Sequence, residues 1–234
     1  MTAAFLLLAV TVIVGAFVQG SGGMGFALVF APVAGLVAAD LMPVALLALM
    51  LPLNGFVLWR ERWAIDWSGV RWVSVARILC TPLGVWVLAI VPADKLGLLI
   101  GGSTVLAALV SLLAPDFKPG RGVYLGAGAV TAVTETATGV GGPPLALAYQ
   151  HRPAPELRAT VAACFLVGEI VSLALLLIQG KGSTSAMASA AALVPALAIG
   201  LWLSSMVHQR ISSARLRMFV LIFAVVSGLL LMVR

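Results

Sequence analysis

The chain has 234 residues, of which 62% are hydrophobic and only 9% are charged, with a mean hydropathy of +1.15. A soluble domain carries about 25% charged residues, so this composition excludes a soluble globular fold and indicates an all-α polytopic membrane protein. The net charge of +6 does not indicate a nucleic-acid partner, because the basic residues lie scattered at the ends of apolar runs, as in membrane loops.

Ten apolar segments follow one another along the chain. Their expected bounds are 2–19, 24–39, 42–59, 68–91, 95–114, 121–138, 143–150, 156–179, 185–207 and 214–233. The first segment has no basic region before it and no small-residue cleavage site, which favours a retained helix over a signal peptide. Segment 143–150 is much shorter than the ~20 residues of a full span, which favours a discontinuous or re-entrant helix.

Two glycine-rich breaks interrupt these segments, at Gly20–Gly25 (GSGGMG) and Thr138–Pro144 (TGVGGPP). Glycine weakens a helix, whereas proline is tolerated in its first turn, so the second break predicts a helix end, a turn and a new helix from Pro143. A helix start presents free N–H groups and a partial positive charge, which favours an anion. The candidate anion-binding residues are Gly20, Ser21, Gly22, Gly23, Thr138, Gly139, Gly141, Gly142 and Pro143.

The two breaks also indicate an internal duplication. Aligning Gly20, Gly22 and Gly23 with Gly139, Gly141 and Gly142 gives one constant offset. The stretch 84–91 matches 200–207 at an offset three residues shorter, which one loop deletion would explain. These matches predict repeats at about 1–115 and 120–234 within a single membrane domain, 1–234. The alternative is coincidence in a chain rich in glycine and leucine.

The basic residues predict the topology. If the ten segments alternate in direction, one side of the membrane receives Arg60, Arg62, Arg71, Lys118, Arg121, Arg152, Arg158, Arg210, Arg215 and Arg217, and the other receives Lys95, Lys181 and Arg234. The positive-inside rule then places both termini outside and the loop between the halves in the cytoplasm. Five segments per half give halves of opposite direction, and inverted repeats with broken helices are typical of transporters.

With its two glycine breaks, the chain resembles the TauE/SafE family of sulfite and organosulfonate exporters over nearly its whole length. The residues that carry the resemblance are Gly20-Ser21-Gly22-Gly23 and Thr138-Gly139-Val140-Gly141-Gly142-Pro143-Pro144. The resemblance implies transport of a small anion, often sulfur-containing, across a bacterial plasma membrane.

Three charged residues lie inside apolar segments: Arg77, Glu135 and Glu169. A charge in hydrocarbon costs about 2.5–3.5 kcal/mol on insertion scales, so each side chain should face a partner or a cavity. Burial favours the protonated carboxyl, which suits a proton relay with protons as the coupling ion. The alternatives are a neutral carboxyl bonded to a neighbouring helix and, for Arg77, snorkelling to the interface or pairing with a glutamate.

Uncharged polar residues near the breaks are further candidates for hydrogen bonds to an oxyanion or, alternatively, between helices. They are Gln19, Asn54, Thr134, Thr136 and Thr138. His151 and His208 fall in predicted loops and receive no catalytic role, and no Cys/His cluster indicates a metal or other cofactor.

Three function classes remain. The leading prediction is a secondary transporter of a small anion in the lipid bilayer. An intramembrane enzyme using Glu135 or Glu169 as a base is the second, but the sequence has no nucleophile–base pattern and no HExxH motif. A membrane subunit without a solute of its own is the third, and it leaves the two helix-weakening breaks unexplained.

Overall fold

The computed structural model describes residues 3–92, 95–113, 120–149, 152–180, 182–207 and 213–233, with only the backbone of 213–217. The described ranges form α1 (Ala3–Gly22), α2 (Phe26–Val37), η1 (Ala39–Leu41), α3 (Val44–Glu61), η2 (Arg62–Ala64), α4 (Trp67–Ile90), α5 (Leu96–Leu113), α6 (Arg121–Thr138), α7 (Gly142–Tyr149), α8 (Ala154–Ile178), α9 (Thr184–Val207) and α10 (Ser213–Val233). Six helices are long and apolar enough to cross a membrane, namely α1, α3 with η2, α4, α5, α8 and α9. The all-α polytopic class is therefore confirmed.

Some residues used in the topology prediction lie outside the described residues. They are Lys118, Lys181, Arg210 and Arg234, together with the side chains of Arg215 and Arg217, and the two histidines without an assigned role, His151 and His208, also lie outside the described residues. The orientation of the chain in the membrane consequently stays a prediction.

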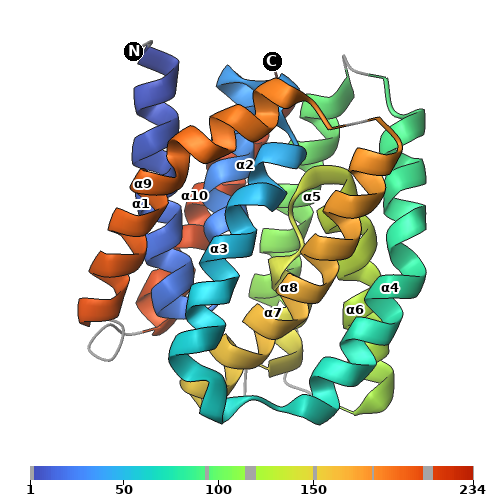
Figure 1. Ribbon diagram of the computed structural model, residues 1–234, viewed down its shortest axis with the longest axis vertical. Helices are drawn as coiled ribbons and strands as arrows, with labels where there is room; N and C mark the ends of the chain where they lie inside the picture. Colours follow the sequence, from blue (N-terminus) through green and yellow to red (C-terminus); the bar gives the residue numbers. More distant parts are fainter. Residues whose placement is uncertain are drawn as a thin grey trace.

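Two helical hairpins enter the bundle from opposite ends. In Figure 1, α1 descends from the N-terminus and α2 returns upward, whereas α6 rises from the lower end and α7 descends again. The chain begins and α10 ends at the same end of the bundle (Figure 1). The two turns approach each other, because a Cβ at Gly142 would lie 3.7 Å from the Cβ of Met24.

The short helices α2 and α7 are enclosed by the long ones. Every residue from Phe26 to Ala31 is buried, and so is every residue from Leu145 to Tyr149. The long spans instead expose large apolar side chains such as Leu79 and Ile178, as expected of surfaces that face lipid. A broken helix at membrane depth must be covered by protein, and here both breaks are covered.

The packing of the helices repeats between the two halves of the chain. If each of α1–α5 is exchanged with the helix whose number is higher by five, the main pairs of helices are again in contact. Helix α4 packs on α6, and their counterparts α9 and α1 pack on each other in the same way. Likewise α3 packs on α9, and the counterparts α8 and α4 are in contact. The pairs α3–α8 and α5–α10 each consist of two counterparts, so the exchange leaves them unchanged. Two inverted repeats, α1–α5 and α6–α10, would produce this arrangement, and on this basis we propose the duplication.

The register of the duplication differs from the alignment of glycines in the sequence. Gly23 and Gly139 both adopt left-handed backbone, with φ 85° and 80°, and each N–H donates to the carbonyl four residues earlier at 2.7 Å. These two glycines are therefore structural counterparts, 116 positions apart, as are Gly84 and Gly200. One offset accounts for both matches, so no loop deletion is required.

The first break is shorter than predicted, because α1 continues through Gly20, Ser21 and Gly22. Glycine costs a helix about 1 kcal/mol per residue, but tertiary hydrogen bonds stabilise this end. Arg60 Nη2 donates to the Gly20 carbonyl at 2.5 Å and Arg158 Nη1 donates to the Ser21 carbonyl at 3.4 Å. Positive charge at a helix C-terminus is favourable, so two arginines outweigh the glycine penalty.

Candidate functional site

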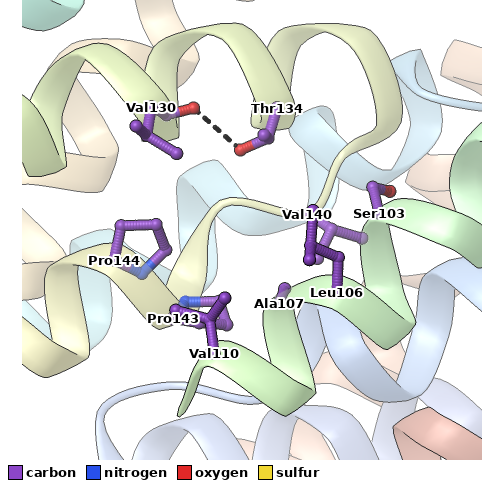
Figure 2. A pocket seen from close by; sticks show the side chains of 9 residues that line it. All are labelled: Ser103, Leu106, Ala107, Val110, Val130, Thr134, Val140, Pro143 and Pro144. Carbon is purple, nitrogen blue, oxygen red and sulfur yellow. Dashed lines mark hydrogen bonds between the residues drawn. The ribbon is translucent and has the colours of Figure 1, made fainter. Parts of the chain in front are cut away.

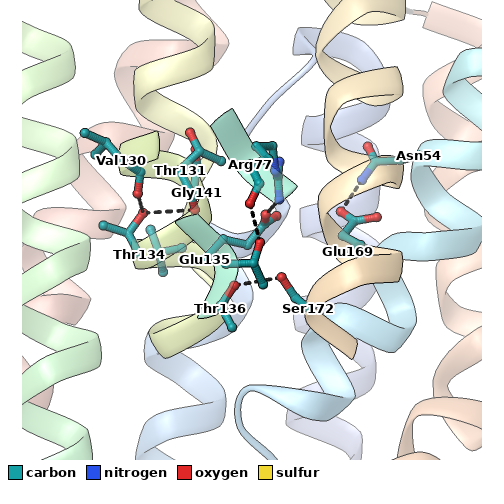
Figure 3. A network of polar contacts seen from close by, with 12 residues as sticks. Asn54, Arg77, Val130, Thr131, Thr134, Glu135, Thr136, Gly141, Glu169 and Ser172 are labelled. Atoms are coloured by element: carbon teal, nitrogen blue, oxygen red, sulfur yellow. Dashed lines mark hydrogen bonds and ion pairs between the residues drawn. The ribbon is translucent and has the colours of Figure 1, made fainter. Parts of the chain in front are cut away.

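Three buried charged residues from three helices form the centre of the molecule. Arg77 of α4 makes an ion pair with Glu135 of α6, and both side chains are 0% exposed (Figure 3). Glu169 of α8 is also fully buried, and its charge acts on Arg77. The sequence singled out each residue separately, and the structure brings all three together.

Arg77 reaches Glu135 across the surface of α8. Its guanidinium lies directly against Gly168, where a Cβ would collide with it, and 5.6 Å from the centroid of the Phe165 ring. Among the described residues, Nε and Nη1 of Arg77 have no hydrogen-bond partner. This cation is therefore desolvated and has unused donors, which is an unusual condition for a residue with a purely structural role.

A chain of amide side chains leads from the charged centre to the first break. Glu169 Oε1 accepts a hydrogen bond from Asn54 Nδ2 at 2.7 Å (Figure 3), and Asn54 Oδ1 accepts one from Gln19 Nε2 at 2.9 Å. Gln19 Oε1 in turn accepts from the N–H of Phe26, the first residue of α2, at 3.0 Å. The start of α2 is thus already occupied by a side chain of the protein.

Other members of the first break pack rather than line a space. A Cβ at Gly20 would meet Ser204 and Leu201 of α9, and the Ser21 hydroxyl donates to the Ser204 hydroxyl at 3.3 Å. Gly22 is the last residue of α1, and Gly23 lies against Leu157 and Arg158 of α8. The four predicted binding residues of this break therefore do not converge on the charged centre.

The second break lies directly beside the charged centre. A Cβ at Gly141 would lie 2.7 Å from the Cβ of Glu135 and 3.3 Å from its carboxyl carbon. The Gly141 carbonyl accepts a hydrogen bond from Thr131 Oγ1 at 3.0 Å, and the N–H of Val140 donates to Thr138 Oγ1 at 3.2 Å. The residue before α7, Gly141, thus lies beside the Glu135 carboxyl, and Gly142 at the start of α7 follows it directly.

The threonines predicted near this break bond within the protein. Thr136 Oγ1 and Ser172 Oγ are 2.7 Å apart, and Thr138 Oγ1 donates to the Thr134 carbonyl at 2.7 Å. These contacts match the alternative in which such residues join helix turns or neighbouring helices.

A second buried ion pair could not be predicted from the sequence, in which Arg60 and Arg158 have the pattern of loop charges. Arg158 Nε donates to both carboxylate oxygens of Glu61, at 2.9 and 2.8 Å, and Arg60 lies 3.4 Å from the same carboxylate. Glu61 stands between Arg60 and Arg62, and this alternation was the only sign in the sequence. The cluster holds the C-terminal end of α1 through its carbonyls.

A cavity of about 120 Å³ lies between α5, α6 and α7 (Figure 2). Thr134 on its wall donates its hydroxyl hydrogen to the Val130 carbonyl at 2.9 Å, and the remaining lining is almost entirely apolar. Leu106 and Val130 on its rim are 63% and 51% exposed, so it opens toward the lipid face. The cavity is lined by Ser103, Leu106, Ala107, Val110, Val130, Thr134, Val140, Pro143 and Pro144. Its chemistry does not suit an anion.

Comparison with known proteins agrees with this architecture. A model of the family described as "Sulfite exporter TauE/SafE" matches residues 7–231 of the chain. No curated protein and no solved structure matches the chain.

Proposed function

Because the chain belongs to the sulfite exporter TauE/SafE family of membrane transporters, we propose that it is a secondary transporter of a small anion, with sulfite or an organosulfonate as its substrate. The observation that carries the proposal is the buried trio of Arg77, Glu135 and Glu169 beside the break between α6 and α7. Charged residues inside a membrane bundle are expensive and typically mark a solute or proton path.

Arg77 is the residue that we assign to anion binding. It is a fully buried cation with unused donors, and guanidinium geometry suits the oxygen atoms of sulfite and sulfonate groups. The start of α7 adds the N–H of Gly142 and the positive end of a helix dipole, to which Pro143 contributes no N–H. Arg77 and the start of α7 together form a region of positive potential inside the protein, and no exposed basic side chain is needed for it.

Glu135 and Glu169 are the groups that we assign to the coupling proton. When both carboxyls are ionised, one guanidinium faces two negative charges, and the buried trio carries a net charge of −1. Glu169 Oε2 has no hydrogen-bond partner within the described ranges, so a proton on this carboxyl removes an uncompensated charge. A proton gradient would in this way drive movement of the anion.

The orientation follows from the basic loops. We propose that the protein lies in a bacterial plasma membrane with both termini outside, because ten basic residues fall on the side that this topology makes cytoplasmic. The position of both chain ends at one end of the bundle fits an even number of crossings (Figure 1).

Flux measurement tests the proposal. The purified protein is reconstituted into liposomes, and sulfite, thiosulfate, methanesulfonate and acetate are compared with and without an imposed proton gradient. We expect gradient-dependent flux of a sulfur oxyanion and its loss in Arg77→Gln. Flux that is equal in wild type and Arg77→Gln, or no flux of any of these anions, would contradict the proposal.

A further inference from the structure

We propose that Glu135 is an internal competitor for the anion site. In the state described here, its carboxylate occupies Arg77 in place of the substrate. When Glu135 takes up a proton it turns to the start of α7, and the substrate anion replaces it on Arg77. The inference deepens the proposed function, on which it rests, by naming how proton and anion are coupled.

The first argument comes from the structural counterparts Gly23 and Gly139. Four residues before each glycine stand Gln19 and Glu135, whose carbonyls accept the glycine N–H. Three residues after each glycine a new helix begins, α2 at Phe26 and α7 at Gly142. Gln19 and Glu135 therefore occupy the same position relative to a helix start, and they differ only in one atom of the side-chain head group.

The two side chains do different things from that position. Gln19 caps α2, because its Oε1 accepts from the Phe26 N–H at 3.0 Å. Glu135 has turned to Arg77, and neither of its oxygens accepts a hydrogen bond from a backbone N–H of the described residues. The carboxyl carbon nevertheless lies 3.3 Å from where a Cβ of Gly141 would be, so it is already beside the turn. Gln19 shows that a side chain at this position can reach the next helix start.

Protonation would release Glu135 from Arg77 and leave its carboxyl free to make the same bond as Gln19. A neutral carboxyl has a carbonyl oxygen that accepts and an O–H that donates, as a glutamine amide does. It has no net charge to hold it on Arg77. The exchange is balanced: Glu135 carboxylate on Arg77, a proton and a free anion become protonated Glu135 and the anion on Arg77. The charge of the pair stays zero before and after, so one proton accompanies each anion.

Arg77 is built to exchange one anion for another. Its guanidinium is fully buried, so loss of Glu135 without replacement would leave a charge whose burial is strongly unfavourable. Gly168 provides the space in which the guanidinium lies, and Phe165 lies 5.6 Å from it. A sulfonate presents oxygen atoms of the same kind as the carboxylate that it would replace.

Few other titratable groups face Glu135. From α8 they are Glu169, which is held by Asn54, and the Cys164 thiol, which is fully buried. On α4 the nearest other candidate in sequence is Cys80, which is only partly buried. Helix α5 (Leu96–Leu113) has no charged residue, and Tyr149, the only titratable residue of α7, lies against Asp66.

Binding of methanesulfonate to the purified protein tests the inference, because this anion keeps its charge from acidic to alkaline pH. In wild type we expect affinity to fall by about tenfold per pH unit on the alkaline side, since one proton must bind with each anion. Glu135→Gln imitates the protonated residue, so it should bind the anion at least tenfold more tightly at alkaline pH and lose the part of the pH dependence that the Glu135 proton causes.

Two further variants serve as controls. Glu61→Gln makes the same chemical change in the other buried ion pair, with Arg158, and should leave the wild-type pH dependence in place. The double variant Arg77→Gln/Glu135→Gln leaves the net charge of the trio as it is in wild type and should not bind methanesulfonate. If Glu135→Gln is unstable without ligand, methanesulfonate added during extraction should restore a monodisperse protein.

The outcomes separate the inference from the proposed function. Glu135→Gln with wild-type affinity and slope, or with no recovery by the anion, overturns the competitor role even if wild type transports sulfite. Arg77-dependent binding that is tighter in Glu135→Gln, without flux in liposomes, supports the exchange at Arg77 and contradicts transport. Equal gains in Glu61→Gln would show a non-specific charge effect and overturn the inference.

Discussion

Replacement of Gly168 by alanine tests how Arg77 is held. Alanine is the better helix former by about 1 kcal/mol, so this change ordinarily stabilises a helix. At Gly168, however, the new methyl group would coincide with the Arg77 guanidinium, which is fully buried between Glu135 and Phe165. Breaking a buried ion pair costs about 3–5 kcal/mol. The expected net effect is a loss of about 2–4 kcal/mol in the free energy of unfolding.

The matched control is Gly126→Ala on α6, another helical glycine. A Cβ there would have no atom of the described chain within 4 Å, so we expect unchanged or slightly higher stability. Both variants are unfolded by SDS in mixed micelles, and methanesulfonate affinity is measured on the same samples. Gly168→Ala that matches wild type in stability and affinity would refute the placement of Arg77, and equal destabilisation of both variants would refute the role of the collision.

The remaining predictions concern the second break and the topology. Gly139→Ala should lower the free energy of unfolding by about 1–2 kcal/mol, because φ is 80° there and the new Cβ would lie 3.0 Å from Leu46; denaturation in SDS measures it, and a stability equal to that of wild type would refute the strain argument. Gly142→Val should fold, since a Cβ there meets nothing closer than 3.7 Å, but should weaken methanesulfonate binding by covering the start of α7; unchanged affinity in the folded variant would remove Gly142 from the site. Single cysteines placed between Pro115 and Gly120 should react with impermeant thiol reagents only from the cytoplasmic side, and labelling from outside would reverse the proposed orientation.

The sequence was sufficient to find the individual charges of the centre. Arg77, Glu135 and Glu169 are conspicuous because charge within an apolar segment is costly. Which of them pair could not be predicted, because that depends on the packing of α4 against α6 and α8. Gly168 also gave no signal, since a single glycine in an apolar helix is common and its meaning appears only once Arg77 lies against it.

The breaks show where local propensity fails. Gly20 and Gly22 are weak helix formers, yet they stay helical because Arg60 and Arg158, far along the chain, bind the carbonyls of Gly20 and Ser21. The second break follows glycine chemistry, with Gly139 in left-handed backbone and α7 beginning at Gly142, one residue before the predicted start at Pro143. Local sequence rules predict the end of a helix where the backbone hydrogen bonds of the turn are made within the turn. They fail where side chains from distant parts of the chain make those hydrogen bonds.

The pairing of Arg77 with Glu135 also has a consequence for how the protein is made. The two residues lie 58 positions apart, from 77 to 135, and the ribosome adds about 5–20 residues per second. Arg77 is therefore synthesised roughly 3–12 s before its partner. During that interval α4 carries an unpaired guanidinium, whose placement in the hydrocarbon of the bilayer costs about 2.5–3.5 kcal/mol.

Membrane integration of this chain is consequently not complete helix by helix. The first five helices hold the cation of the central trio, and the last five hold both of its carboxyl groups. The first half inserted alone would place the Arg77 guanidinium in the bilayer without a carboxylate partner, and the second half supplies that partner. Because α4, α6 and α8 belong to one chain, continuous synthesis brings the cation and the carboxyl groups together. Two separately encoded halves would first have to meet in the membrane.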